Sequence, residues 1–238
     1  MQKFVKKVID SLFCFVCPPF CVHCKSALSS SSSILCSPCT ETLELLEVEG
    51  RCPFCFSEQS GSAPCKKCLQ KKRYCDYVAS ALSYEGAAKS LVHELKYADR
   101  PYLAKTLSAY LLLQLHELKW PHFDLITFVP QSLTKAMQRG YNQSKLICKE
   151  LALRLSSSWK PLLLKKQDTL AQAKLSQEKR ELLPHDTFVL KKNAQIEDKV
   201  ILLIDDVYTT GTTLDRCAEA LKVGYPKRVY ALTLLHAG

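Results

Sequence analysis

The sequence predicts an α/β protein: a mostly parallel β-sheet with flanking helices, preceded by a small zinc-ribbon module. Beyond residue 76, short apolar segments alternate with stretches of helical periodicity, which is typical of a parallel sheet covered on both faces. Eleven of the thirteen cysteines lie before residue 76, and most form Cys-x-x-Cys pairs. A chain of 238 residues, 47% hydrophobic, has room for both parts, which we expect at residues 1–76 and 77–238.

The chain begins with an amphipathic stretch. Apolar residues recur at helical spacing between Phe4 and Phe13, with lysines between them. A signal peptide and a membrane-surface helix are alternatives, but Asp10 interrupts the apolar run and no small-residue cleavage site follows. We therefore expect a short packing helix. No segment is long and apolar enough to span a bilayer, so we expect a cytoplasmic protein.

Two cysteine quartets follow this helix. Each consists of two Cys-x-x-Cys pairs, separated by eleven residues in the first quartet and by nine in the second. Four thiolates at this spacing suit one tetrahedral zinc ion, and repeated Cys-x-x-Cys without a secretory signal favours zinc over disulfides. We expect about two structural zinc ions, because so small a module needs metal in order to fold. The predicted ligands are Cys21, Cys24, Cys36 and Cys39, then Cys52, Cys55, Cys65 and Cys68.

A further pair, Cys14 and Cys17, offers a different grouping, in which it shares one site with Cys21 and Cys24. We disfavour this grouping because two prolines stiffen the connection and because the other half of the first quartet would lose its partners. The roles of Cys14, Cys17 and Cys75 stay open.

The second part of the chain alternates strands with helices. Strands are predicted over residues 77–84, 125–129, 187–190, 200–204 and 228–235. Helices are predicted over residues 87–95, 102–118, 144–155 and 214–223. In parallel sheets, ligands gather at the carboxyl ends of the strands. The segments that begin at Pro130 and at Asp205 should therefore lie at the same edge.

The strongest functional signal lies between residues 200 and 214. An apolar strand is expected to end at two adjacent carboxylates, Asp205 and Asp206. A hydroxyl-rich loop and a helix follow; the loop residues are Thr209, Thr210, Gly211, Thr212 and Thr213. A helix N-terminus favours an anion, threonine hydroxyls add donors, and glycine lets the backbone come close. The pattern predicts a site for a phosphate beside a polyhydroxylated group. It lacks the Gly-Lys-Ser/Thr ending of a P-loop.

The run Asp-Asp-Val-Tyr-Thr-Thr-Gly-Thr-Thr closely resembles the phosphoribosyl-pyrophosphate (PRPP) signature of type I phosphoribosyltransferases. The resemblance implies that fold. It also implies that Thr209 to Thr213 hold the 5-phosphate, that Asp205 and Asp206 contact the ribose 2- and 3-hydroxyls, and that magnesium accompanies PRPP.

Other segments resemble ComF-type proteins, which are phosphoribosyltransferase-like proteins with an N-terminal zinc ribbon, linked to DNA uptake in competent bacteria. These segments are Leu95-Lys96-Tyr97, Phe128-Val129-Pro130, Arg139-Gly140-Tyr141-Asn142-Gln143, and Gln172, Arg180 and Phe188. The resemblance implies PRPP contacts from Lys96, Val129, Pro130, Arg139, Gly140 and Arg180, with the loop after Pro130 facing the pyrophosphate. It makes residues 165–183 a flexible catalytic hood. The sequence departs from the family where Phe128 replaces a proline and where an asparagine after Arg180 is missing.

Several functions agree with this resemblance. The first is a phosphoribosyltransferase that takes part in DNA uptake or DNA handling and transfers ribose 5-phosphate to an unassigned acceptor through an oxocarbenium-like state; no residue identifies itself as the base. The second is a non-catalytic PRPP sensor that binds single-stranded DNA or a helicase-like partner. The third is a nucleotide-salvage enzyme. Whether the chain forms a homo-oligomer stays open.

The formal net charge of +10 indicates an anionic partner. A basic run with tyrosines nearby suggests single-stranded nucleic acid, with a solvated linker as the alternative. The residues concerned are Lys66, Lys67, Lys71, Lys72, Arg73, Tyr74 and Tyr77.

Overall fold

The computed structural model describes residues 19–28, 30, 33–61, 63–166 and 187–237. The predicted N-terminal helix with Cys14 and Cys17, and most of the predicted hood with Arg180, lie outside the described residues. Among those described, no helix is long and apolar enough to cross a membrane.

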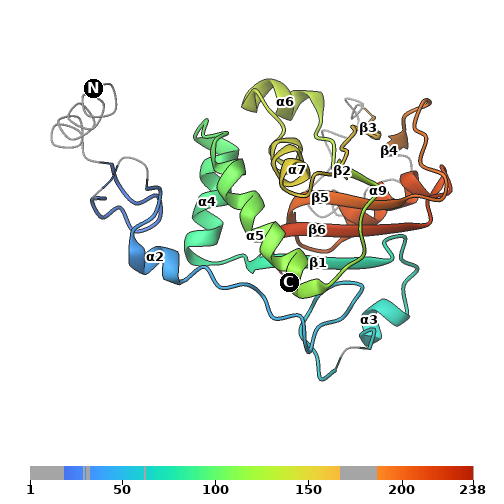
Figure 1. Cartoon of the computed structure of the whole chain (residues 1–238), viewed down its shortest axis with the longest axis horizontal. Helices are drawn as coiled ribbons and strands as arrows, with labels where there is room; N and C mark the ends of the chain where they lie inside the picture. The colour runs from blue at the N-terminus through green and yellow to red at the C-terminus, as the bar shows by residue number, and fades with distance from the viewer. Residues whose placement is uncertain (1–18, 29, 31–32, 62, 167–186, 238) are drawn as a thin grey trace, which may run out of the picture.

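Four parallel strands form the central sheet, in the order β1-β6-β5-β2 (Figure 1). They are β1 (Tyr77–Ser83), β2 (Leu125–Phe128), β5 (Val200–Tyr208) and β6 (Arg228–His236). Their residues are mostly buried on both faces, which explains their continuous apolar runs. Residues 158–160 extend the sheet beyond β2, because the Ile126 N–H donates to the Ser158 carbonyl and the Lys160 N–H to the Ile126 carbonyl (2.9 and 3.0 Å).

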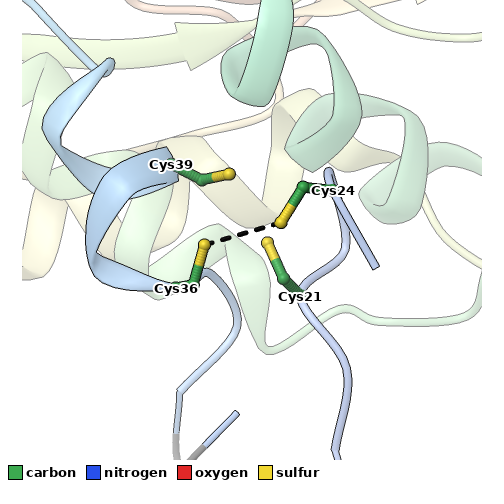
Figure 2. Close-up of side chains that lie close together, drawn as sticks. All are labelled: Cys21, Cys24, Cys36 and Cys39. Carbon is green, nitrogen blue, oxygen red and sulfur yellow. Dashed lines mark hydrogen bonds between the residues drawn. The ribbon is translucent and has the colours of Figure 1, made fainter. Parts of the chain in front are cut away.

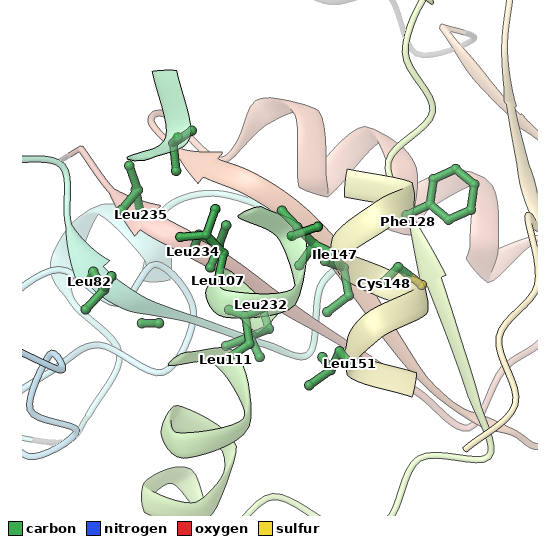
Figure 3. Close-up of a cluster of buried hydrophobic side chains, with 14 of the residues drawn as sticks. Leu82, Leu107, Leu111, Phe128, Ile147, Cys148, Leu151, Leu232, Leu234 and Leu235 are labelled. Atoms are coloured by element: carbon green, nitrogen blue, oxygen red, sulfur yellow. The ribbon is translucent and has the colours of Figure 1, made fainter. Parts of the chain in front are cut away.

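Helices cover both faces of this sheet. On one face lie α4 (Gly86–Tyr97), α5 (Leu103–Leu118) and α7 (Gln143–Arg154). Figure 3 shows Leu107 and Leu111 of α5 and Ile147 and Leu151 of α7 gathered with Leu232 of β6 in this core. On the other face lies α9 (Thr212–Lys222), together with a small antiparallel sheet of β3 (Leu163–Lys165) and β4 (Phe188–Leu190). The prediction of a parallel α/β sheet with flanking helices is confirmed.

The connections around β2 and β5 diverge. From β2 the chain passes through α7 to the segment at residues 158–160, outside β2; from β5 it passes through α9 to β6, on the other side. Divergence of this kind opens a crevice at the carboxyl ends of the two strands, where ligands bind in doubly wound sheets. The ends of β2 and β5 are thus the expected position of a site.

Three predicted elements need correction. Residues 187–190 do not join the central sheet, since β4 pairs antiparallel with β3. The strand predicted over residues 200–204 does not end at the acids: it runs to Tyr208, because β6 is long enough to pair with Asp205, Val207 and Tyr208. The segment after Pro130, expected as a loop, contains helix α6 (Leu133–Arg139).

The cysteine-rich region forms two small knuckled units around α2 (Ser37–Glu41) and α3 (Lys66–Leu69). The second unit packs directly on the sheet: the Val78 N–H donates to the Pro53 carbonyl oxygen (2.9 Å), and cysteines of this unit share a buried cluster with residues of β5 and α9. The cysteine-rich part before residue 77 and the α/β part after it therefore share a common core. The domain boundary at residues 76 and 77 stays a prediction.

Candidate functional site

A cavity of about 670 Å³ opens at the carboxyl ends of β2 and β5. The segments after Pro130 and after Asp205 thus line the same cavity, as predicted. Its lining residues are Lys96, Tyr97, Val129, Pro130, Gln131, Ser132, Arg139, Asn142, Gln143, Ser144, Lys165, Phe188, Asp205, Asp206, Thr209, Thr210, Thr212 and Thr213.

Asp206 is buried and has both carboxylate oxygens engaged. Lys96, from the last turn of α4, donates to one oxygen from Nζ at 2.8 Å. Gln143, from the first turn of α7, donates to the other oxygen from Nε2 at 2.6 Å. Such contacts offset the cost of burying a polar group. Lys96 and Gln143 thus fix the Asp206 side chain in place.

Asp205 has a different environment. Its Oδ1 accepts hydrogen bonds from Ser144 Oγ and from the Asp206 N–H, both at 2.9 Å. No described residue donates to its Oδ2, and the residue lines the cavity. Burial, followed by the nearby charge of Asp206, raises the pKa of Asp205 to about 7. This carboxylate is able to accept a hydrogen bond from a ligand hydroxyl or to bind a hard cation such as magnesium.

The loop from Thr209 to Thr213 joins β5 to the N-terminus of α9. Thr210 and Thr212 share a hydroxyl hydrogen bond of 2.9 Å, and the Thr212 N–H lies 3.4 Å from Thr210 Oγ1. Gly211 has a φ of +75°, and a Cβ there would lie 2.6 Å from the Tyr208 hydroxyl. The glycine is therefore required by the turn itself. The first residues of α9, Thr212 and Thr213, line the cavity, so the positive end of the helix dipole faces it.

Arg139 adds a further positive side chain to the cavity lining. The Arg139 guanidinium stacks over the Tyr97 ring, 4.7 Å from its centroid, and its Nη2 donates to the Tyr97 hydroxyl at 3.0 Å. Arg139 comes from the end of α6, and Tyr97 from the end of α4. The stack holds the guanidinium at the cavity, where such a group suits phosphate oxygens.

The N-terminus of α7 aligns the partners of the acidic pair. Asn142 caps this helix by accepting from the Lys145 N–H at 2.9 Å, and its amide nitrogen donates to the Val129 carbonyl at 3.1 Å. The cap ties the helix start to the end of β2, and it directs Gln143 and Ser144 at the two aspartates. These roles were not predicted from the sequence, although an asparagine before a helical stretch is a known cap signal.

The predicted site residues divide into three groups. Those that line the cavity are Lys96, Val129, Pro130, Arg139, Asp205, Asp206, Thr209, Thr210, Thr212 and Thr213. Gly140 and Gly211 are not lining residues but turn residues with positive φ. Arg180 lies outside the described residues. The other lining residues are Tyr97, Gln131, Ser132, Asn142, Gln143, Ser144, Phe188 and Lys165, the last of which begins the predicted hood.

The two cysteine quartets assemble as predicted. In each, all four sulfur atoms lie within 4.8 Å of one another, a spacing that suits one metal ion. Figure 2 shows the four side chains of the first cluster turned toward one another. The neighbouring His23 is not a member, since it hydrogen-bonds Ser90 at 2.9 Å. Cys75 is buried outside both clusters.

Only part of the basic run predicted to bind nucleic acid is exposed. Arg73 forms an ion pair of 2.9 Å with Asp215 of α9, and both side chains are largely buried. Tyr77 stacks on Tyr230 with ring centroids 5.1 Å apart. These two residues are therefore structural. The residues of the run that stay exposed are Lys66, Lys67, Lys71 and Lys72.

Comparisons with known proteins agree with this description. Residues 149–238 match the family described as phosphoribosyl transferase domain. DNA utilization protein YhgH of Salmonella typhi is 30% identical over 210 residues, which cover 86% of this chain and 91% of that protein. Competence protein ComFC of Streptococcus pneumoniae is 29% identical over 210 residues, covering 87% and 90%.

Among solved structures, adenine phosphoribosyltransferase from Thermoanaerobacter pseudethanolicus aligns with a TM-score of 0.37 at 11% identity, over 84% of this chain and 98% of that one. Because this TM-score is low, the fold assignment rests on the strand order and on the family match. The identity and coverage of the YhgH relative show the family of the chain. The chain belongs to the ComF family of phosphoribosyltransferase-like proteins, with a type I phosphoribosyltransferase-like domain and two cysteine clusters at its N-terminal end.

Proposed function

We propose that the cavity binds PRPP together with magnesium, and that the protein transfers ribose 5-phosphate to an acceptor that is still to be identified. One observation carries the proposal. A helix N-terminus rich in hydroxyls and an aspartate with an available oxygen line the same cavity, at the carboxyl edge of a parallel sheet. A phosphorylated pentose matches both.

The 5-phosphate is assigned to the Thr209–Thr213 loop. The first N–H groups of α9 have no partner within the helix, and the dipole of an 11-residue helix favours an anion there. Thr209 and Thr210 are exposed at the mouth of the loop, so their hydroxyls are accessible to a ligand. These groups together suit a phosphate monoester.

The pentose is assigned to the acidic pair. Vicinal hydroxyls donate well to carboxylates, and Asp205 offers the Oδ2 to which no described residue donates. Lys96 and Gln143 keep Asp206 from turning, so the pair presents one fixed edge to the sugar. Asp205 would also hold magnesium, whose preferred ligands are carboxylate, phosphate and water oxygens.

The pyrophosphate is assigned to the side of Pro130 and Arg139. Magnesium, when bound, neutralises charge on the leaving pyrophosphate. Arg139 contributes a second positive charge there, held in place by Tyr97. Among the described lining residues, Asp205 and Asp206 are the sole carboxylates, and no histidine or cysteine is present. The base and the acceptor site thus stay unassigned.

Calorimetric titration of PRPP with magnesium tests the proposal. Wild-type protein should bind, whereas Asp205→Ala combined with Asp206→Ala should abolish binding without unfolding the chain. A matched control, Glu117→Ala with Glu197→Ala, removes two exposed charges outside the cavity and should leave the affinity unchanged. Unchanged affinity in the aspartate variant would refute the assignment.

We also propose that this PRPP-binding protein takes part in DNA uptake or DNA handling. The support is the naming of its relatives as DNA utilization and competence proteins, and the exposed lysines beside the second cysteine cluster. We expect zinc in both clusters.

A non-catalytic PRPP sensor is the second candidate, and it is favoured by the lack of a base among the described lining residues. Incubation with PRPP, magnesium and a panel of nucleobases separates the two. Release of pyrophosphate with formation of a glycosidic product indicates the enzyme. Tight PRPP binding without turnover indicates the sensor.

A further inference from the structure

Both ends of the Thr209–Thr213 loop are connected to the same cysteine cluster. We call this loop the phosphate loop, and the cluster of Cys52, Cys55, Cys65 and Cys68 the second cluster. The residue before the loop, Tyr208, and a residue in the first turn of α9, Asp215, are each linked to the second cluster through one intermediate side chain.

The first link runs through His236. The Tyr208 ring is buried and stacks on the His236 ring, with centroids 4.9 Å apart and an angle of 7° between the planes. His236 Nε2 lies 2.9 Å from the carbonyl oxygen of Cys55; because a carbonyl only accepts, the ring nitrogen donates. Tyr208 in turn lies directly under Gly211, the residue that shapes the loop. A displacement of Cys55 would therefore change the position of Tyr208 and, through it, the turn at Gly211.

The second link runs through Arg73. Its Nη2 donates to Cys68 Sγ at 3.4 Å, and its Nη1 donates to Asp215 Oδ2 at 2.9 Å. The other oxygen of Asp215 lies 3.3 Å from the Tyr74 N–H. The Asp215 N–H closes the first turn of α9 by donating to the Gly211 carbonyl at 2.9 Å. The helix start is thus anchored to a cysteine sulfur by a largely buried ion pair.

The first cluster has a different environment. Cys21 and Cys39 pack with Ala87 of α4, and His23 hydrogen-bonds Ser90 of the same helix. In the part of the chain that the structure describes, no hydrogen bond or ion pair joins the four cysteines of this cluster to the phosphate loop or to α9. The two clusters therefore provide a comparison within one molecule.

We propose that the second cluster, with its metal bound, sets the geometry of the phosphate loop, and that Arg73 and His236 are positioning residues for the 5-phosphate. A metal bound by four thiolates fixes Cys55 and Cys68 relative to each other, and this fixes both ends of the loop. The inference rests on the proposed function of the loop as a phosphate site.

The test compares Arg73→Met and His236→Phe with Arg51→Met. His236→Phe keeps an aromatic ring on Tyr208 but cannot donate to Cys55. Arg51 belongs to the same cysteine unit, but its hydrogen bonds stay within that unit, to Glu47, Phe56 and Glu58. We expect Arg73→Met and His236→Phe each to weaken ribose 5-phosphate binding by about tenfold in calorimetry, and Arg51→Met to change it less than about twofold. The affinity for pyrophosphate should stay unchanged in all three variants. This control distinguishes a change in the phosphate loop from a general loss of structure.

Amide hydrogen exchange over residues 208–215 provides a second readout that needs no ligand. We expect faster exchange in Arg73→Met, His236→Phe and Cys68→Ser, and wild-type exchange in Arg51→Met and in the first-cluster variant Cys24→Ser. Unchanged loop exchange in the first three variants would overturn the inference, as would equal losses in both clusters. If wild-type protein binds no ribose 5-phosphate, the proposed function fails, while the exchange experiment still decides the positioning role.

Discussion

At the scale of single residues, the two adjacent aspartates have opposite roles. Asp206 is engaged by Lys96 and Gln143, whereas Asp205 keeps an oxygen to which no described residue donates. Asp206 forms an ion pair with Lys96, whereas the pKa of Asp205 is raised by burial and by the charge of its neighbour. Protonation of Asp205 is therefore the pH-dependent feature of the site.

The pH dependence of stability tests this asymmetry. The pKa of Asp205 is raised to about 7, mainly by burial and then by Asp206. Because a carboxyl in the unfolded chain titrates near pH 4, the folded protein holds this proton more tightly. The resulting stabilisation is present below about pH 4 and is lost as the pH rises toward 7.

Asp205→Asn removes this titration. We expect the free energy of unfolding of wild type, relative to the variant, to fall by about 2–3 kcal/mol between pH 5 and pH 8. Urea unfolding at both pH values measures the difference. A difference that does not change with pH would mean that Asp205 titrates normally.

Gly211 provides a second test at this scale. Gly211→Ala forces an L-residue to a φ of +75° and places its Cβ 2.6 Å from the Tyr208 hydroxyl. We expect a loss of about 2–3 kcal/mol in stability. Gly140→Ala is the matched control, because its φ is +73° with no atom within 4 Å of the added Cβ, and it should cost only about 1 kcal/mol. Equal costs would exclude the clash with Tyr208.

The residues of the site differ in how far the sequence could predict them. The acids and threonines stand together in one run, and so a local pattern revealed them. Gln143 and Ser144, which engage the acids, are more than 60 residues away in the chain. Their role depends on α7 packing beside β5, which no local pattern encodes. Gly211 was predicted, but for approach to an anion; in the structure, contact with Tyr208 requires it.

At the scale of elements, helix and strand types were predicted better than pairings. The five predicted strands exist, but the segment at residues 187–190 pairs with β3, a three-residue strand too short to stand out in the sequence. Strand β5 continues past its apolar run because backbone pairing with β6 does not depend on side-chain polarity. Helix α6 has no buried apolar stripe among its described side chains, so periodicity gave no signal.

For the two cysteine clusters, we predict the zinc content and the thermal stability of variants. Elemental analysis should find about two zinc ions per chain, and about one in either Cys24→Ser or Cys68→Ser. The clusters differ in packing, because Cys68 shares a buried core with β5 and α9 while Cys24 is exposed. Cys68→Ser should therefore lower the midpoint of thermal unfolding by about 5 °C or more relative to Cys24→Ser. Equal midpoints would contradict the packing account, and absence of zinc would contradict the metal assignment.

At the scale of the whole molecule, the +10 charge is shared between the cavity and the surface. Lys96 and Arg139 serve the cavity, while Lys66, Lys67 and their neighbours stay exposed near the second cluster. If those lysines bind single-stranded DNA, affinity must fall steeply with salt, because each neutralised phosphate releases counterions.

Charge reversal distinguishes this local surface from general attraction. Lys66→Glu with Lys67→Glu should reduce the slope of log affinity against log salt by about 1 to 2. Lys192→Glu with Lys227→Glu changes the net charge equally at two other exposed positions and should leave the slope unchanged. Fluorescence anisotropy with labelled single-stranded DNA at several salt concentrations measures both. Equal effects would indicate that binding depends on net charge alone.

The most direct test of the proposed site is a crystal structure of the protein in complex with ribose 5-phosphate. We expect the phosphate to lie against the first N–H groups of α9 and the threonine hydroxyls, and the ribose hydroxyls to lie within hydrogen-bonding distance of Asp205. A sugar phosphate bound elsewhere, or one whose hydroxyls face away from the aspartates, would contradict the proposed site.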